Sequence, residues 1–158
     1  MKYFWIPLFI FCYALDQATK WAVVRWIEFG EGVEIIPGFF NLVHIGNTGV
    51  AFGSLSGSNT VLIFFTFGIL VAIAVMAWRG AFRSRLTATA ITLLAAGALG
   101  NLTDRIVHGH VVDFLDFYLP IYGRWPSFNV ADSCICIAAA LLIIGAFLER
   151  REPKTLSS

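Results

Sequence analysis

The stretch TVLIFFTFGILVAIAVMAW, from Thr60 to Trp78, has no charged residue and is long enough to cross the hydrocarbon core of a bilayer as one helix. Three more apolar stretches are interpreted as spans: from about Tyr3 to Val24, from about Leu86 to Leu102, and from about Phe128 to Leu148. Four spans with their loops use up nearly all of the 158 residues. The sequence therefore predicts an all-α membrane protein with four transmembrane helices in a single domain, residues 1–158.

The composition agrees with this class. Hydrophobic residues make up 58% of the chain and charged residues 13%. The mean hydropathy of +0.78 is far above that of soluble domains. No low-complexity tract is present, which excludes a disordered or fibrous chain.

The first stretch has a rival interpretation as a cleavable signal peptide, because Met1 and Lys2 precede an apolar run. That run continues past Asp16 to Val24 and shows no small-x-small cleavage site. We therefore prefer an uncleaved first helix.

The basic residues predict the orientation. Seven of the eleven Lys and Arg residues fall at ends that four alternating helices would bring to one side: Lys2, Arg79, Arg83, Arg85, Arg150, Arg151 and Lys154. The opposite loops carry a net negative charge. The positive-inside rule therefore places both termini in the cytoplasm and the two long loops outside.

Both outer loops have a pattern of their own. Between the first two spans, Val33, Ile35 and the run Phe39–Ile45 are rich in β-branched and aromatic residues, and Pro37-Gly38 is a turn signal. We expect a small extracytoplasmic β element there. The other loop contains VVDFLDFYL, Val111–Leu119, which we interpret as a short interfacial segment.

Two aspartates, Asp113 and Asp132, fall near the outer interface on this topology. A carboxylate close to hydrocarbon is costly, so each needs a partner, water or a function. Two neighbouring carboxyls cannot both ionise easily, so one can take a proton from water while the other donates to a carbonyl oxygen. The residues alone do not single out this pair, because Asp16, Asp104 and Asp116 also qualify.

Other polar residues near the spans have a structural and a functional interpretation. Asp16 and Lys20 share a helical face and could simply neutralise each other, or they could brace a site. Asn101 stands beside a run of small residues that allows close helix packing, and Asn129 opens the fourth span with Asp132 and Ser133. These residues could be ordinary helix ends or parts of one site.

A metal site is a further alternative, since His108-x-His110 precedes Asp113. The helical H-E-x-x-H pattern of zinc proteases is absent, as are a Gly-rich phosphate loop and a G-x-S-x-G elbow. The three cysteines fall inside proposed spans and indicate neither a disulfide framework nor a zinc site. We expect no metal and no cofactor.

Five strings resemble the lipoprotein signal peptidase family, also called signal peptidase II. In chain order they are LDQATK (residues 15–20), NTGVAFG (47–53), GALGNLTDR (97–105), GHVVDF (109–114) and FNVADS (128–133). The resemblance covers nearly the whole chain. Its departures are small: Gly46 stands where an aromatic or polar residue is common, and Val50 replaces a usual alanine.

The resemblance implies a bacterial inner-membrane aspartic endopeptidase that cuts a prolipoprotein just before a cysteine carrying diacylglycerol. It places the catalytic pair on Asp113 and Asp132. The substrate-binding or dyad-supporting residues that follow from the motifs are Asp16, Lys20, Asn47, Gly97, Asn101, Arg105, Asn129, Ala131 and Ser133. The resemblance also implies that globomycin-type peptides inhibit the protein and that membrane lipids surround it. It implies a monomer, with no nucleic acid as a partner.

Two other classes of function stay open on the residues alone. A small proton-coupled transporter could use Asp16 and Asp132 as an ion path, although we find neither inverted repeats nor broken helices. A non-catalytic assembly factor could pack with partner helices, but it would leave the buried charges without a role.

Overall fold

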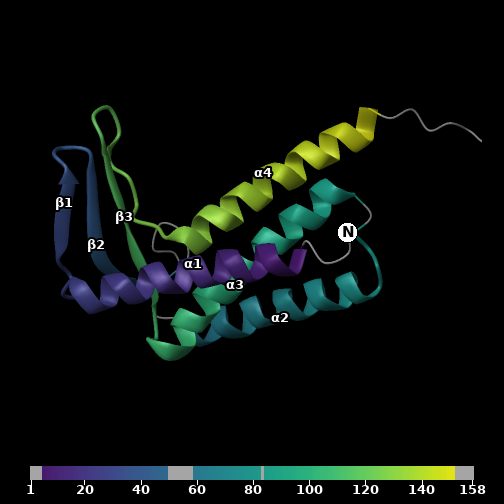
Figure 1. Cartoon of the computed structure of the whole chain (residues 1–158), viewed down its shortest axis with the longest axis horizontal. Helices are drawn as coiled ribbons and strands as arrows, with labels where there is room; N and C mark the ends of the chain where they lie inside the picture. Colours follow the sequence, from purple (N-terminus) through teal and green to yellow (C-terminus); the bar gives the residue numbers. More distant parts are fainter. Residues whose placement is uncertain (1–4, 50–58, 83, 152–158) are drawn as a thin grey trace, which may run out of the picture.

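The protein folds into four long helices with a small antiparallel sheet at one end (Figure 1). The computed structural model describes residues 5–49, 59–82 and 84–151. The helices are α1 Trp5–Trp26, α2 Asn59–Trp78, α3 Arg85–Val107 and α4 Val130–Arg151. The strands are β1 Gly32–Ile36, β2 Phe40–Asn47, β3 Val111–Leu119 and β4 Gly123–Arg124.

Three of these helices are long and apolar enough to cross a membrane: α2, α3 and residues 130–148 of α4. They correspond to three of the four predicted spans. The helix α1 is also long, with 22 residues, and carries the charged residues Asp16, Lys20 and Arg25. Tyr3, where its span was predicted to start, lies outside the described residues, as do residues 50–53 of one family string.

The helix α3 contains the predicted apolar span from about Leu86 to Leu102 and extends beyond it. Instead of stopping at Leu102, α3 continues to Val107. Asn101, Asp104 and Arg105 therefore lie within its last two turns, on ordered helical backbone, and not in a frayed terminus. The apolar run ended earlier than the helix because these polar side chains find partners inside the protein.

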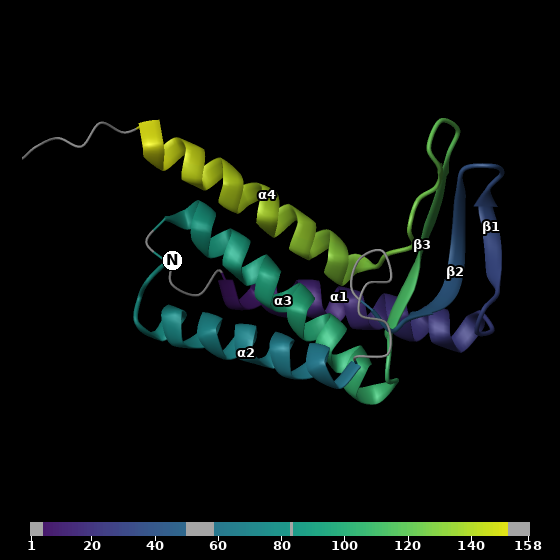
Figure 2. The same cartoon turned by 180° about the vertical axis from the view of Figure 1, so that it is seen from behind.

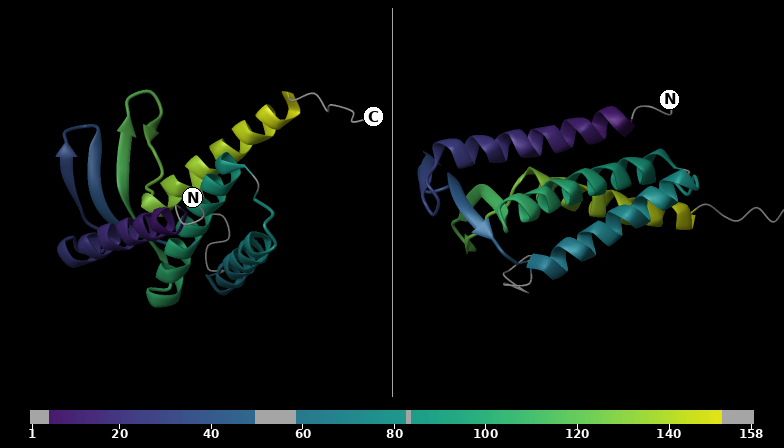
Figure 3. Two further views of the ribbon diagram at one scale, coloured as in Figure 1. Left: turned by 45° about the vertical axis from the view of Figure 1, so that its right-hand side comes forward. Right: turned by 90° about the horizontal axis from the view of Figure 1, so that it is seen from below.

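The helix α3 is the centre of the bundle. It packs against α1, α2 and α4, and Figure 3 shows it between α1 and α2. Among the described residues of α2 only Leu62 is buried, whereas Phe64, Phe65 and Phe67 are exposed. A helix that is apolar on all sides and open on most of them suits contact with lipid, where exposed apolar side chains carry no penalty.

Small residues let α3 and α4 approach closely. Gly97 and Gly100 of α3 face Ala131 of α4, and Ala131 is fully buried. A Cβ atom added to Gly97 would collide with the backbone carbonyl oxygen of Ala131. This backbone contact brings the N-terminus of α4 against the polar end of α3.

The sheet corrects the expectation for Val111–Leu119. The predicted β element is present as β1 and β2, but the supposed interfacial segment is the third strand of the same sheet, in the order β1-β2-β3-β4. Its β-branched and aromatic residues complete the ladder along β2, as Figures 1 and 2 show. The protein is therefore mostly helical with one small antiparallel sheet.

The sheet is attached to the helices by a small apolar core. Val112 and Phe114 of β3 pack with Val23 of α1, and all three are buried. The end of α1, the start of α2, the end of α3 and the start of α4 all lie at the sheet end of the molecule (Figures 1 and 2). The polar residues of the family strings are thereby gathered at this end.

The close approach at Gly97 leads to a first prediction. Gly97→Ala should destabilise the protein by about 1–3 kcal/mol, because the new methyl group collides with backbone of α4 that cannot move freely. Gly68→Ala in α2 is the matched control, since nothing lies within 4 Å of its added Cβ and alanine favours a helix by up to about 1 kcal/mol. Thermal unfolding of both variants in detergent is the measurement. Equal melting temperatures for the two variants would contradict this packing.

Candidate active site

The start of α4 is fixed by a reciprocal pair of hydrogen bonds. The side-chain Oδ1 of Asn129, the residue before the helix, accepts the backbone N–H of Asp132 at 2.9 Å. In return, Oδ2 of Asp132 accepts the backbone N–H of Asn129 at 3.3 Å. This capping box holds the Asp132 carboxyl in the first helical turn, where the helix dipole favours a negative charge.

Asn129 also reaches the second acid. Its Nδ2 donates to Oδ1 of Asp113 at 2.8 Å, and the Asn129 side chain is fully buried. The other oxygen of Asp113 accepts Nδ2 of Asn47 at 3.0 Å. The register of β2 on β3 pairs Asn47 with Val111, which places the end of β2 beside Asp113. One asparagine therefore contacts both predicted catalytic acids.

A third asparagine joins the acids to α1. Nδ2 of Asn101 donates to Oδ1 of Asp132 at 2.8 Å. Its own Oδ1 accepts Nζ of Lys20 at 3.0 Å and Nδ2 of Asn129 at 3.3 Å. Because every one of these amide groups has a partner on both sides, the two carboxyls are held by neutral donors in fixed positions.

Lys20 is the cation of the buried network and is only 3% exposed. Its Nζ lies 2.9 Å from Oδ2 of Asp16 and 2.8 Å from Oδ2 of Asp104. The remaining oxygen of Asp16 accepts the backbone N–H of Ala131 at 2.8 Å, and Oδ2 of Asp104 accepts the backbone N–H of Val112 at 3.1 Å. Lys20 thus ties α1 and α3 to the start of α4 and to the strand that carries Asp113.

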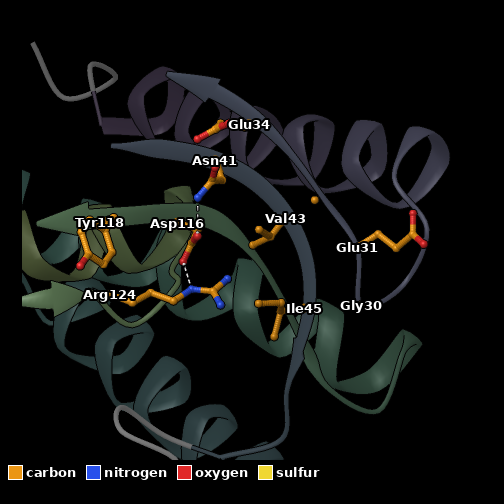
Figure 4. A pocket seen from close by; sticks show the side chains of 10 residues that line it. Gly30, Glu31, Glu34, Asn41, Val43, Ile45, Asp116, Tyr118 and Arg124 are labelled. Atoms are coloured by element: carbon orange, nitrogen blue, oxygen red, sulfur yellow. Dashed lines mark hydrogen bonds and ion pairs between the residues drawn. The ribbon is translucent and has the colours of Figure 1, made fainter. Parts of the chain in front are cut away.

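Asp116 belongs to a different environment. It lies three residues after Asp113 on β3, so its side chain points to the opposite face of the sheet. Asp116 lines a pocket of about 490 Å³ and contacts Arg124 Nε at 2.7 Å and Asn41 Nδ2 at 3.0 Å. Figure 4 shows its side chain pointing toward both partners. Burial raises the pKa of Asp116, but its hydrogen bonds to Arg124 and Asn41 outweigh burial and leave it below the ordinary value.

The five candidate acids are thus separated by their partners. Asp16 and Asp104 share Lys20, and Asp116 has Arg124. Within residues 5–49, 59–82 and 84–151, Asp113 and Asp132 form no ion pair within 4 Å. This difference, which the sequence could not reveal, selects them from the other acids.

The proton affinity of Asp113 is unusual. Its pKa is raised to about 7, first because the carboxyl is buried and only 3% exposed, and second because the charge of Asp132 is close. The hydrogen bonds from Asn47 and Asn129 oppose this shift without cancelling it. A carboxyl that still holds a proton near neutral pH can act as an acid, while a neighbouring carboxylate acts as a base.

A cavity of about 610 Å³ adjoins Asp132. Asn47, Asp132 and Ser133 line its polar part, and the side chains of Trp125, Phe128, Pro126, Ile135 and Ile137 make the rest mainly apolar. An elongated apolar ligand lying along α4 would therefore meet one carboxyl of the pair.

Comparison with known proteins agrees with this geometry. Residues 8–148 match the family model described as signal peptidase (SPase) II. The chain belongs to the signal peptidase II family. It is 42% identical to the lipoprotein signal peptidase of Aeromonas hydrophila, covering 94% of this chain and 90% of the relative, and 46% identical to that of Ralstonia nicotianae, covering 89% and 82%.

Two solved structures, both described as bacterial membrane enzymes, have a similar fold. One has a TM-score of 0.87 at 36% identity and covers 98% of this chain and 93% of its own. The other has a TM-score of 0.79 at 38% identity and covers 90% and 91%. The sheet and the helix arrangement are thus shared with two bacterial membrane enzymes, and the signal peptidase II family, to which the chain belongs, is a family of membrane proteases.

The remaining motif residues have supporting positions. Ala131 and Gly97 form the α3–α4 contact, and the Ser133 hydroxyl donates to the backbone carbonyl of Asn129 at 3.0 Å. Arg105 is buried and donates through Nη2 to the carbonyl of Gly49 at 2.6 Å. Neither Ser133 nor Arg105 forms a hydrogen bond to Asp113 or Asp132 among the contacts of the described residues.

Sequence reasoning missed two supporting residues of this signal peptidase II. Asp104 was one of five candidate acids, but was not predicted to share Lys20. Gln17 was not considered, although its Nε2 contacts Asp16 at 3.1 Å, Asp104 at 3.1 Å and the Gly100 carbonyl at 3.3 Å. Its place beside Asp16 in the LDQATK string was the available signal.

The histidines do not join the acids. His108 and His110 have ring centroids 6.1 Å apart, and His110 packs on Gly46, where a Cβ atom would meet its ring at 2.8 Å. In the part of the chain that the structure describes, no group of three or more His, Cys, Asp or Glu side chains is arranged to hold a metal ion.

The buried cation gives a second prediction. Lys20→Met should cost about 3–5 kcal/mol of stability, because it leaves the Asp16 and Asp104 carboxyls buried without a cation. Arg124→Gln is the matched control, since the Arg124 side chain is 61% exposed and the buried Asp116 keeps its donors Asn41 and Ser127, so the loss should be smaller, about 1 kcal/mol. Unfolding in detergent measures both. A larger loss for Arg124→Gln would refute the assignment of Lys20 as the structural cation.

The raised pKa of Asp113 gives a third prediction. Because the folded-state pKa of about 7 exceeds the unfolded value of about 3.9, the stabilising effect of the protonated group is complete below about pH 4 and is lost as pH rises through 7. Asp113→Asn cannot ionise, so its free energy of unfolding should rise relative to wild type by on the order of 2 kcal/mol between pH 5 and 8.

Melting temperatures across this pH range check the third prediction. Asp116→Asn is the control, because the pKa of Asp116 is lowered and its contribution is constant above pH 5. A difference between Asp113→Asn and wild type that does not change with pH would rule out a proton held by Asp113.

Proposed function

We propose that this protein cleaves the signal peptide of diacylglyceryl-modified prolipoproteins immediately before the lipidated cysteine, as an aspartic endopeptidase of the bacterial inner membrane. The proposal rests on one observation above all: Asn129 donates to two carboxyls, through its side-chain Nδ2 to Asp113 and through its backbone N–H to Asp132, and neither carboxyl forms an ion pair among the described residues. Membership of the signal peptidase II family and the printed names of its relatives supply the substrate class.

The catalytic step uses one proton shared by the pair. Asp132, held at the start of α4, takes a proton from a water molecule while the water oxygen attacks the scissile carbonyl carbon. Asp113, whose pKa is raised to about 7, donates its proton to the carbonyl oxygen. The tetrahedral intermediate then collapses: Asp132 gives its proton to the leaving amine, and Asp113 recovers one from the intermediate. The pair ends as it began.

The three asparagines position this chemistry without supplying charge. Asn47 holds Asp113, Asn101 holds Asp132, and Asn129 holds both. A full positive charge in their place would stabilise both carboxylates and remove the proton that the mechanism needs. Neutral donors fix the geometry and leave the shared proton in place.

We propose that α1 is the fourth membrane span. Asp16 and Lys20 are buried against other helices, whereas Ile6, Ile10 and Phe11 are exposed. Lipid would therefore meet mainly the apolar side of α1, despite its charges. Asp16 and Lys20 are thus directed to the interior, as membrane interiors require, while the exposed Arg25 lies in the last turn of α1.

This topology places both termini in the cytoplasm and the sheet and the dyad near the periplasmic face. Arg79 and Arg85 lie at the end of the bundle away from the sheet, as the positive-inside rule requires of the cytoplasmic side. Of the other basic residues used for this orientation, Lys2, Arg83 and Lys154 and the side chains of Arg150 and Arg151 lie outside the described residues.

The substrate would enter from the lipid. The apolar wall of the cavity along α4 suits a signal segment and its acyl chains, with the scissile bond delivered to Asp132. Globomycin-type peptides would compete for this cavity. The whole chain acts as one domain and as a monomer in this proposal, with membrane lipids and the lipidated substrate as its partners.

The fourth prediction tests this function. The purified protein in detergent should cleave a diacylglyceryl-modified prolipoprotein, and Asp113→Asn or Asp132→Asn should each lower kcat by at least about 100-fold. A chelator should leave the rate unchanged, because two acids and water need no metal.

Asp116→Asn is the matched control, since it removes a carboxylate from the same strand but from its other face. It should keep most of the activity. Cleavage by either folded dyad variant at the wild-type rate, or cleavage of a prolipoprotein without its diacylglycerol at an equal rate, would contradict the proposal.

A further inference from the structure

The orientation of the Asn47 side-chain amide is set by Gly49, which it contacts on the side away from Asp113. Oδ1 of Asn47 accepts the backbone N–H of Gly49 at 3.0 Å, so its Nδ2 is left to donate to Asp113 at 3.0 Å. If Gly49 moved, Asn47 would lose the bond that fixes which end of its amide faces the acid. Gly49 is therefore the next residue outward from the site.

Gly49 is in turn held by Arg105. Nη2 of Arg105 donates to the Gly49 carbonyl at 2.6 Å, and this contact is buried. A charged donor makes one of the stronger hydrogen bonds available to a backbone carbonyl. The guanidinium of Arg105 can keep Gly49 in place only if it is itself fixed.

Asn59, the first residue of α2, supplies that fixation. Its Nδ2 donates to the backbone carbonyl of Arg105 at 3.1 Å, and its Oδ1 accepts Nη1 of Arg105 at 3.4 Å. One side chain thus holds both the backbone and the guanidinium of Arg105. A continuous path of hydrogen bonds runs from Asn59 through Arg105, Gly49 and Asn47 to Asp113.

We infer that Asn59 is a positioning residue for Asp113, acting through Arg105, Gly49 and Asn47. Only the expected effect of Asn59 on catalysis rests on the proposed function; its effect on the pKa of Asp113 does not. Asn59 forms no hydrogen bond to either acid among the contacts of the described residues, so its effect on Asp113 must pass along this path.

Breaking this path of hydrogen bonds should raise the pKa of Asp113. The Asn47 hydrogen bond lowers the pKa of Asp113, so a looser Asn47 lets Asp113 keep its proton to higher pH. The charged groups that act on Asp113 are Asp132 from α4, Lys20 from α1 and Arg105 from α3. A substitution at Asn59 removes none of these charges. A less firmly held Arg105 guanidinium would weaken a positive charge near Asp113, which raises the pKa of Asp113 in the same direction as a looser Asn47.

The fifth prediction follows for Asn59→Ala. The alkaline limb of the pH profile of kcat, where Asp113 loses its proton, should move upward by about half a pH unit. The value of kcat at neutral pH should fall several-fold because Asp113 is less well placed, while KM changes little. Thr60→Ala is the matched control, since it is the next residue of α2, is exposed, and should leave the profile unchanged.

A double-mutant cycle tests the path itself. Asn47→Ala should move the same limb upward, and adding Asn59→Ala to it should produce no further shift, because the two residues act in series. Additive shifts would overturn the inference. A fall in kcat or in melting temperature with an unmoved limb would overturn it too, since Asn59 would then only stabilise the start of α2.

A second readout needs no substrate and separates this inference from the proposed function. The difference in melting temperature between the Asp113→Asn variant and wild type grows with pH until Asp113 is fully ionised. Measured in the Asn59→Ala background, the pH at which this difference levels off should be higher than in wild type. An unchanged levelling pH refutes the role of Asn59, whether or not the protein cleaves prolipoproteins.

Discussion

The site depends on the side chain of Asn129, which is buried between a helix and a strand. Its oxygen caps α4 and sets the position of Asp132, and its nitrogen donates to Asp113 on β3. The helix α4 and the strand β3 are thereby held in a fixed position relative to each other. Had this residue been aliphatic, α4 would lose the side-chain oxygen that caps it, and Asp113 would lose one of its two amide donors.

Around this link, charge is distributed unevenly. Lys20 neutralises Asp16 and Asp104, which are used as structural anchors for the start of α4 and for β3. The remaining pair receives amide donors alone. A buried ion pair is in general weak evidence for stability. Here Lys20 neutralises Asp16 and Asp104, whereas Asp113 and Asp132 are buried without an ion pair among the described residues. This burial, together with the charge of Asp132, raises the pKa of Asp113.

Much of the fold could be predicted from local pattern, because apolar runs such as Thr60–Trp78 need no knowledge of their neighbours. The strand at Val111–Leu119 could not, since it forms by pairing with β2 more than sixty residues earlier in the sequence. At the site, Asp16 and Lys20 were paired from their spacing, whereas Asp104 became their third partner only through the contact of α1 with α3. The choice of Asp113 over Asp104 or Asp116 came from the family resemblance, and the structure supplies a physical reason for it.

The central claim is that Asp113 and Asp132 share one proton near neutral pH, and infrared titration of the carboxyl groups tests it most directly. The account predicts that the wild-type protein loses one buried carboxylic-acid band with a midpoint near pH 7, that Asp113→Asn abolishes this step, and that Asp132→Asn moves its midpoint downward because the neighbouring charge is gone. A wild-type protein whose carboxyl groups all titrate near pH 4, or a neutral-pH step that survives in Asp113→Asn, would contradict it.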